Sequence, residues 1–121
     1  MKINNFEDID AWQKARDLVN KIYEITGKGD FQEDYSLKDQ IRRAGVSVIS
    51  NIAEGFDRQS DQEFIRFLYM AKGSVSEVQT QLYIAKDQNY ITSEEFNVLY
   101  EKVEEISRLI GGLIRYLKKD S

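Results

Sequence analysis

Four polar residues, Arg43, Ser47, Asn51 and Glu54, form the one group in this chain whose spacing could assemble a catalytic site. They follow one another at intervals of four, four and three residues, which places them together on one face of a helix. A glutamate there could transfer protons and an arginine could hold an anion, but a nucleophilic serine needs a neighbouring base. The chain contains no histidine and no cysteine. We therefore interpret the row as a structural polar network that fixes helix register, since polar groups inside a bundle must be paired.

Metal chemistry is not indicated either. The carboxylate-bridged metal sites of helical bundles need a Glu-x-x-His pair on their helices, and histidine is absent. No acidic loop has the ligand spacing of a calcium or magnesium site. We predict a protein with no catalytic, cofactor-binding or metal-binding residues, and hence no enzymatic activity. The sequence identifies no small-molecule substrate.

Basic residues raise a second possibility, which is binding to RNA or DNA. The candidate contacts are Arg42, Arg43, Arg58, Arg66 and Lys72, followed by a basic pair at Lys118 and Lys119. Against this, 17 lysines and arginines face 21 acidic residues, a net charge of −4, and affinity for nucleic acid grows with the number of phosphates neutralised. A ring of subunits would nevertheless multiply even a modest basic patch.

The elements that must position these side chains are all helical. Apolar residues recur every three to four positions in four segments, at about residues 8–26, 36–55, 61–88 and 93–118. The last two segments keep the unbroken four-three alternation of a bundle seam. Their seam positions are Phe64, Leu68, Ala71, Val75, Val78, Leu82 and Ala85, then Phe96, Leu99, Val103, Ile106, Ile110, Leu113 and Leu117. We predict a single all-α domain over residues 1–121, an antiparallel up-down-up-down four-helix bundle.

Capping residues mark the expected helix ends. Two pairs have the spacing of a capping box, Ser60 with Glu63 and Thr92 with Glu95. Ser36 is expected to cap the segment over 36–55, and Gly55 is expected to close it. Gly27 fits a left-handed cap after the first helix.

The segment over 36–55 carries more apolar surface than one bundle contact needs. One stripe, Ile41, Ala44, Val48 and Ile52, would face the core. A second stripe lies beside it, formed by Val46, Ile49 and Ala53. In the third segment, Gly73, Ser74 and Ser76 form a strip of small residues suited to close packing. We predict that this second stripe and this strip lie at the interface of a homo-oligomer, because exposed apolar patches usually mark contact sites.

The sequence also carries an expectation about compartment. Its first residues have no apolar core of the kind that signal peptides contain, and no apolar run approaches the ~20 residues of a membrane span. We therefore expect a soluble, cytoplasmic protein with no membrane partner.

One long run carries a resemblance to a known family, RRAGVSVISNIAEGFDRQSDQEFIRFLYMAKGSVSEVQTQLYIA. With FEDIDAWQKA and IYEIT upstream, it resembles the four-helix-bundle proteins encoded by intervening sequences within 23S rRNA genes, over essentially the whole chain. The signature residues are Arg43, Ala44, Ser47, Asn51, Ile52, Ala53, Glu54 and Gly55, then Phe64, Leu68, Ala71, Gly73, Ser74, Glu77 and Thr80. The chain departs from the family at Gln32 and Ile49, where proline is usual, and the second departure should straighten its helix.

The resemblance implies a ring-like homo-oligomer, typically a pentamer. A distantly related family, the accessory proteins of diversity-generating retroelements, uses the same bundle to bind nucleic acid. The expected function is therefore that of a non-enzymatic, self-assembling helical-bundle protein that serves as a scaffold or adaptor. The alternative is a nucleic-acid-binding accessory protein.

Overall fold

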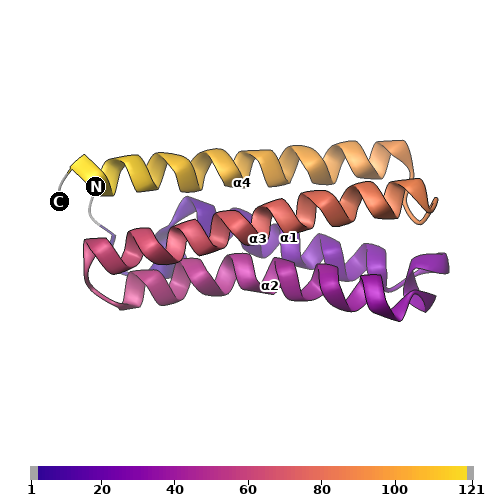
Figure 1. Cartoon of the computed structure of the whole chain (residues 1–121), viewed down its shortest axis with the longest axis horizontal. Coiled ribbons are helices and arrows are strands. Elements are labelled where there is room, and N and C mark those ends of the chain that lie inside the picture. The colour runs from indigo at the N-terminus through magenta and orange to yellow at the C-terminus, as the bar shows by residue number, and fades with distance from the viewer. Residues whose placement is uncertain (1–2, 120–121) are drawn as a thin grey trace.

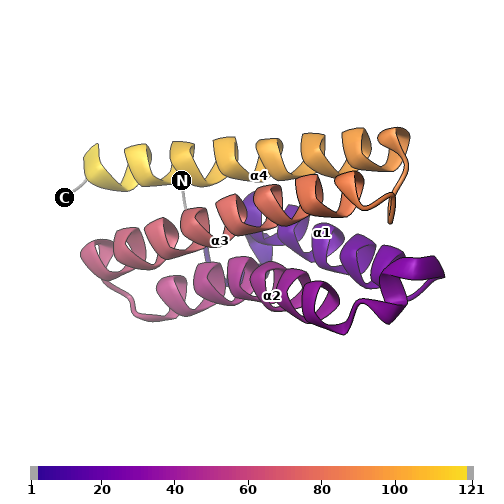
Figure 2. The same cartoon turned by 45° about the vertical axis from the view of Figure 1, so that its right-hand side comes forward.

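The computed structural model describes residues 3–119, and this part of the chain contains helices and no strand (Figure 1). Four α-helices, α1 (Asp10–Thr26), α2 (Tyr35–Asp57), α3 (Asp61–Asp87) and α4 (Ser93–Lys119), follow one another. Two short 3-10 helices, η1 (Phe6–Asp8) and η2 (Gly29–Glu33), precede α1 and α2. The turn between α2 and α3 lies at the opposite end from the other two connections (Figure 2). The predicted all-α antiparallel four-helix bundle is confirmed.

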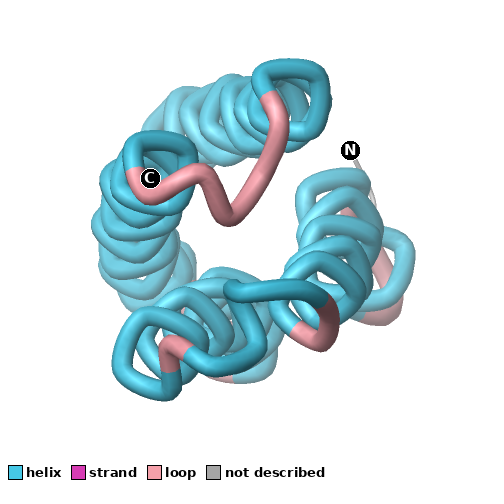
Figure 3. The backbone as a smooth tube through the Cα atoms, turned by 90° about the vertical axis from the view of Figure 1, so that its right-hand side faces the viewer, coloured by secondary structure: helices cyan, strands magenta, loops and turns pink. Residues whose placement is uncertain are grey.

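The four helices surround a common centre, as the view along the bundle axis shows (Figure 3). Every predicted seam position of α3 and α4 is buried there, and so is the first apolar stripe of α2. Because successive seam residues alternate by four and three, they stay on one side of each helix along its whole length. The most extensive contact between helices lies between α2 and α3. The core is therefore the one that the apolar periodicity predicted.

The two capping boxes differ in how completely they form. At the start of α4, the backbone N–H of Thr92 donates to Glu95 Oε1 at 2.9 Å, and the N–H of Glu95 donates to Thr92 Oγ1 at 3.0 Å. At the start of α3, Ser60 Oγ accepts from the N–H of Glu63 at 3.4 Å, whereas the Glu63 carboxylate turns to Arg66. The first box is reciprocal and the second is half formed, because an arginine one turn on competes for the carboxylate.

The cap of α2 is Asp34, and the prediction that Ser36 caps this helix was wrong. Asp34 Oδ1 accepts from the backbone N–H of Leu37 at 3.0 Å, so α2 begins one residue earlier, at Tyr35. Aspartate caps as well as serine does, and η2 delivers Asp34 to the cap position. The hydroxyl of Ser36 instead accepts a bond from Gln40 Nε2 at 3.1 Å.

Two glycines also play other parts than expected. Gly27 has φ −96°, so it is not a left-handed cap. Gly55 does not close α2, which continues to Asp57 and runs without interruption through Ile49. Gly55 is buried instead, and a Cβ built there would lie 2.6 Å from the Cβ of Phe67 on α3. Its lack of a side chain lets α2 and α3 approach each other closely.

Asp34 also joins the two connections at one end of the bundle. Tyr90, in the α3–α4 turn, donates its hydroxyl to Asp34 Oδ2 at 2.9 Å and stacks on Phe31 of η2, with ring centroids 5.2 Å apart. The Leu37 N–H and, to a smaller extent, the Tyr90 hydroxyl lower the pKa of Asp34 below its ordinary 3.8. The same bond raises the pKa of Tyr90.

We expect this cap to make the bundle acid-sensitive. Since the folded state holds the ionised form of Asp34, the stabilisation is present above about pH 4 and is lost as pH falls through the lowered pKa. Replacing Asp34 with Asn, which caps helices but carries no charge, should flatten the decline of the urea midpoint between neutral and acid pH. The control is Asp17→Asn, an exposed position on α1. An Asp34→Asn profile as steep as that of the parent would contradict the prediction.

Candidate functional site

The polar row of α2 forms a short hydrogen-bonded chain with α3. Asn51 Nδ2 donates to the carbonyl oxygen of Ser47 at 2.8 Å and approaches its Oγ at 3.1 Å. The hydroxyls of Ser47 and Ser74 are 2.9 Å apart across the helix contact. This chain of Ser47, Asn51 and Ser74 pairs partly buried polar groups where α2 meets α3, which is the role expected of a structural network.

Arg43 and Glu54 stand outside that chain. The Nε of Arg43 is 2.9 Å from Asp39 Oδ2, in an exposed pair one turn earlier on the same helix. Glu54 is exposed and makes no hydrogen bond or ion pair within residues 3–119. The nearest groups to the Ser47 hydroxyl are thus an amide and a second hydroxyl, neither of which is a general base. The row offers no activated nucleophile.

Of the predicted nucleic-acid contacts, Arg42 is held against α1. Its Nε donates to Thr26 Oγ1 at 2.8 Å, and its guanidinium lies 4.2 Å from the centre of the Tyr23 ring. Arg42 thereby ties the start of α2 to the end of α1, a structural role that leaves one face of its guanidinium against an aromatic ring.

Arg58 and Arg66 both lie over one aromatic ring, that of Phe67. Their guanidinium groups are 4.8 Å and 4.7 Å from the centre of the Phe67 ring. Arg66 also forms two bonds to Glu63, 3.0 Å and 3.1 Å long, which raise its pKa. Arg66 thus has a carboxylate partner, whereas Arg58 is exposed and has none within residues 3–119.

Lys72 lies in a basic groove that the sequence pattern did not predict. The groove has a volume of about 410 Å³ between α3 and α4, and Arg108 and Arg115 line it together with Lys72. The only signal in the sequence was the seven-residue spacing of Arg108 and Arg115, which puts both on one face of α4. Nothing in that spacing places them opposite Lys72, because that depends on how α3 and α4 pack.

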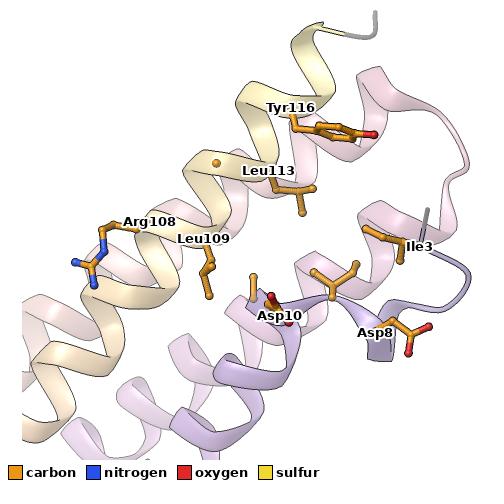
Figure 4. Close-up of a pocket in the computed structure, with 10 residues that line it drawn as sticks. Ile3, Asp8, Asp10, Arg108, Leu109, Leu113 and Tyr116 are labelled. Atoms are coloured by element: carbon orange, nitrogen blue, oxygen red, sulfur yellow. The ribbon is translucent and has the colours of Figure 1, made fainter. Parts of the chain in front are cut away.

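An apolar cleft of about 360 Å³ lies between the start of α1 and the second half of α4. Ile9, Leu109, Leu113 and Tyr116 are among its lining residues, while Arg108 lies at its edge with its charged group directed outward (Figure 4). A site for chemistry needs convergent polar groups as well as an apolar wall. This cleft is mainly an apolar wall, and its other charged lining residues are Asp8 and Asp10.

The predicted interface residues lie on two sides of α2. Gly45 faces α1, since a Cβ built there would lie 2.9 Å from Ile22 Cδ1, and Ile49 is one turn further along the same face. Ser47 faces α3 through its contact with Ser74. The stripe of Val46, Ile49 and Ala53 therefore borders α1, whereas the strip of Gly73, Ser74 and Ser76 is on α3.

The two sets also differ in exposure. Val46 is 40% exposed, and Ile49 and Ala53 are partly buried. Ser74 is buried and already bonded within the fold, while Gly73 and Ser76 are exposed. A Cβ built at Gly73 would meet no atom within 4 Å, so this glycine permits no close approach inside the subunit.

Metal ligation and membrane insertion find no support in the described part of the chain. Within residues 3–119, no three side chains of the metal-binding types His, Cys, Asp and Glu gather in one place. No described helix combines the length and the apolar character needed to cross a bilayer.

Comparisons with known proteins agree with this fold. Residues 7–112 match the family model of the 23S rRNA-intervening sequence protein. A solved structure from Bacteroides thetaiotaomicron, a protein of unknown function from the S23 ribosomal protein family, is 26% identical with a TM-score of 0.78. The alignment covers 86% of this chain and 97% of that one. No curated protein gives a significant match. The chain therefore belongs to the 23S rRNA-intervening sequence protein family.

Proposed function

We propose that this protein is a non-enzymatic, self-assembling helical bundle that serves as a scaffold or adaptor. The observation that carries the proposal is a half-exposed apolar surface along the junction of α1 and α2. We call it the α1–α2 seam, and its members are Trp12, Val19, Tyr23, Val46, Ile49, Ala53 and Phe56. Tyr23 and Val46 are 45% and 40% exposed, and the other five are partly buried.

The antiparallel register brings the seam residues of the two helices side by side. Arg42 contacts Tyr23 near one end, and a Cβ built at Gly45 would lie 3.6 Å from Val19 Cγ2. Moving two turns along each helix from this contact, in opposite directions, brings Trp12 beside Ala53. Trp12 in turn packs on Phe6 of η1, with ring centroids 5.3 Å apart. This largely apolar band also carries the guanidinium groups of Arg16 and Arg42, which lie over the Trp12 and Tyr23 rings. Exposed apolar surfaces often mark contacts with other proteins.

A second copy of the chain is the occupant that we propose for the α1–α2 seam. The outer face of α3 offers a complementary surface, because Met70 and Ile84 are 46% and 42% exposed on the same side as Gly73. Gly73 leaves that face flat between them, since nothing lies within 4 Å of its missing Cβ. A contact between the α1–α2 seam of one subunit and the outer face of α3 of the next joins two different surfaces. Repeated around an axis, such a contact closes into a ring.

The subunit number is part of this proposal. Family resemblance points to a pentamer, and a ring of that kind gives each subunit two neighbours through one repeated contact. Such an assembly presents several copies of every outward surface, which is what a scaffold or adaptor requires. Within residues 3–119 the Ser47 hydroxyl is hydrogen-bonded to Asn51 and Ser74 and to no base, which supports a role without catalysis.

The test is a pair of charge substitutions in the seam. Val46→Arg and Ile49→Arg should both release subunits near 14.1 kDa in sedimentation, from a parent of several times that mass. A guanidinium buried at the contact would lack a partner, and its desolvation opposes assembly. The helical circular dichroism should persist, most clearly for Val46→Arg, because Val46 is the more exposed of the two.

The matched control is Val98→Arg on α4, where the side chain is 48% exposed and outside the seam. This variant should keep the mass of the parent. A parent that sediments as a monomer at micromolar concentration would overturn self-assembly. Assembly that survives both seam substitutions would place the contact on another surface and reject the seam.

A further inference from the structure

Two adjacent glycines of α4 leave room for a cluster of cations. A Cβ built at Gly111 would lie 3.5 Å from Arg115 Nη1 and 4.0 Å from Lys72 Nζ. A Cβ built at Gly112 would lie 3.8 Å from Arg115 Nη2. The guanidinium therefore lies along the bare surface of the helix, and the Lys72 ammonium of α3 reaches the same spot. Arg108 lines the same groove.

None of these three cations is neutralised by the fold. Within residues 3–119, Lys72, Arg108 and Arg115 make no hydrogen bond or ion pair. Glu104 also lines the groove, so its lining carries three positive charges and one negative charge. Like charges gathered around one point repel, and an anion placed among them relieves that repulsion. Arg43 and Arg66, by contrast, each have a carboxylate partner.

The helix dipole does not explain the gathering. Cations are favoured near a helix C-terminus, but the effect falls off within the last turn. Arg108 lies roughly three turns before the end of α4 at Lys119, beyond that reach. The same helix is acidic in its first half, at Glu94, Glu101, Glu104 and Glu105, and then basic. The groove therefore lies where the positive charge of α4 begins and where α3 adds a lysine.

We propose that this α3–α4 groove binds a phosphate group, carried by a small phosphorylated molecule or by the backbone of a nucleic acid. Arginine offers a planar fork that matches two oxygens of a phosphate, and lysine adds a compact charge. Gln79 and Ser107 line the groove as well and supply neutral hydrogen-bond donors. This site does not depend on assembly through the α1–α2 seam.

The first test removes two cations. Binding of pyrophosphate is measured by calorimetry, and binding of a fluorescent single-stranded RNA or DNA by anisotropy, for the parent and for Lys72→Gln/Arg115→Gln. The double variant should bind at least tenfold more weakly. In the oligonucleotide arm, the slope of log affinity against log salt should become shallower by roughly 1.4, since each phosphate contact with a single strand contributes about 0.7. The matched control, Lys14→Gln/Lys21→Gln, removes the same charge from exposed positions on α1 and should bind as the parent does.

The second test fills the groove from within. Gly111→Asp places a carboxylate beside Arg115 and Lys72, so it should compete with an external phosphate and abolish binding. Gly111→Ala adds only a methyl group at ordinary contact distances and should preserve binding. Circular dichroism and sedimentation identify any variant that changes the fold or the assembly.

The probes separate the two sources of phosphate. Pyrophosphate binding that depends on the groove supports a small phosphorylated ligand, and oligonucleotide binding alone supports a nucleic-acid strand. The proposal is overturned if neither probe binds, if the α1 control weakens binding as much as the groove variant, or if Gly111→Asp binds as tightly as Gly111→Ala. Since the variants leave the seam untouched, failure here is distinct from failure of self-assembly.

Discussion

Replacing Val78 with aspartate should remove a large part of the stability of this bundle, at a cost of about 4 kcal/mol or more. Val78 is fully buried on the core-facing side of α3. Among the described residues, the core contains no cation that could pair with a carboxylate there. The charge must therefore be neutralised or hydrated at the expense of packing. A domain of this size has a total stability of roughly 5–15 kcal/mol, so the variant should melt some 10–20 °C lower.

Thermal and urea denaturation followed by circular dichroism measure this effect. Val98→Asp is the matched control, because it makes the same chemical change at a valine of α4 that is 48% exposed. Its free energy of unfolding should stay within about 0.5 kcal/mol of the parent. Melting of Val78→Asp within a degree or two of the parent would mean that Val78 is not in the core.

Replacing Gly55 with alanine should destabilise the protein, although alanine favours helices by about 1 kcal/mol over glycine. The new methyl group would lie 2.6 Å from the Cβ of Phe67 and 3.0 Å from Phe64 Cδ1. Because the Cβ of Phe67 is fixed to the backbone, α3 must move away from α2, and overpacking of this kind costs roughly 1–3 kcal/mol. After the helix preference is subtracted, we expect a net loss of about 1 kcal/mol in urea unfolding.

Gly73→Ala is the matched control on the facing helix. A Cβ there meets nothing within 4 Å, so the helix preference alone acts and the variant should gain about 1 kcal/mol. Both substitutions are best made in the Val46→Arg protein, so that subunit contacts do not enter the measurement. Opposite signs for the two glycines are the expected result. A stabilised Gly55→Ala would show that α2 and α3 are further apart than the structure has them.

Local sequence was enough to predict the helices, their buried faces and the starts of α3 and α4. A core residue of α3 or α4, such as Leu68 or Ile106, is buried because apolar residues recur with the period of the helix. This periodicity can be read from one helix at a time. The capping box of Thr92 and Glu95 is likewise a contact between residues three apart. Asp34 and Ser36 could each cap α2 on local grounds. Asp34 is the residue that does so, because η2 and the Tyr90 hydroxyl hold it in place.

The candidate site was less predictable, because its contacts join different helices. The periodicity of α2 placed Arg43, Ser47, Asn51 and Glu54 on one face, but the Ser47 hydroxyl lies beside Ser74 of α3 while Arg43 turns to Asp39. The long side chain of an arginine can pair with any carboxylate within its reach, and along a helix several carboxylates lie within that reach. The sequence pattern identified the polar face, and the structure decided which of its members meet.

The sequence by itself determined that this protein is an antiparallel four-helix bundle, since periodicity and caps act over a few neighbouring residues. Only the tertiary structure decided that Lys72 meets Arg115 beside Gly111, and that Gly55 lies against Phe67. The rotation of each helix about its axis and its register along its neighbour depend on all side chains in the shared contact. No spacing within one helix encodes which residue of another helix lies opposite.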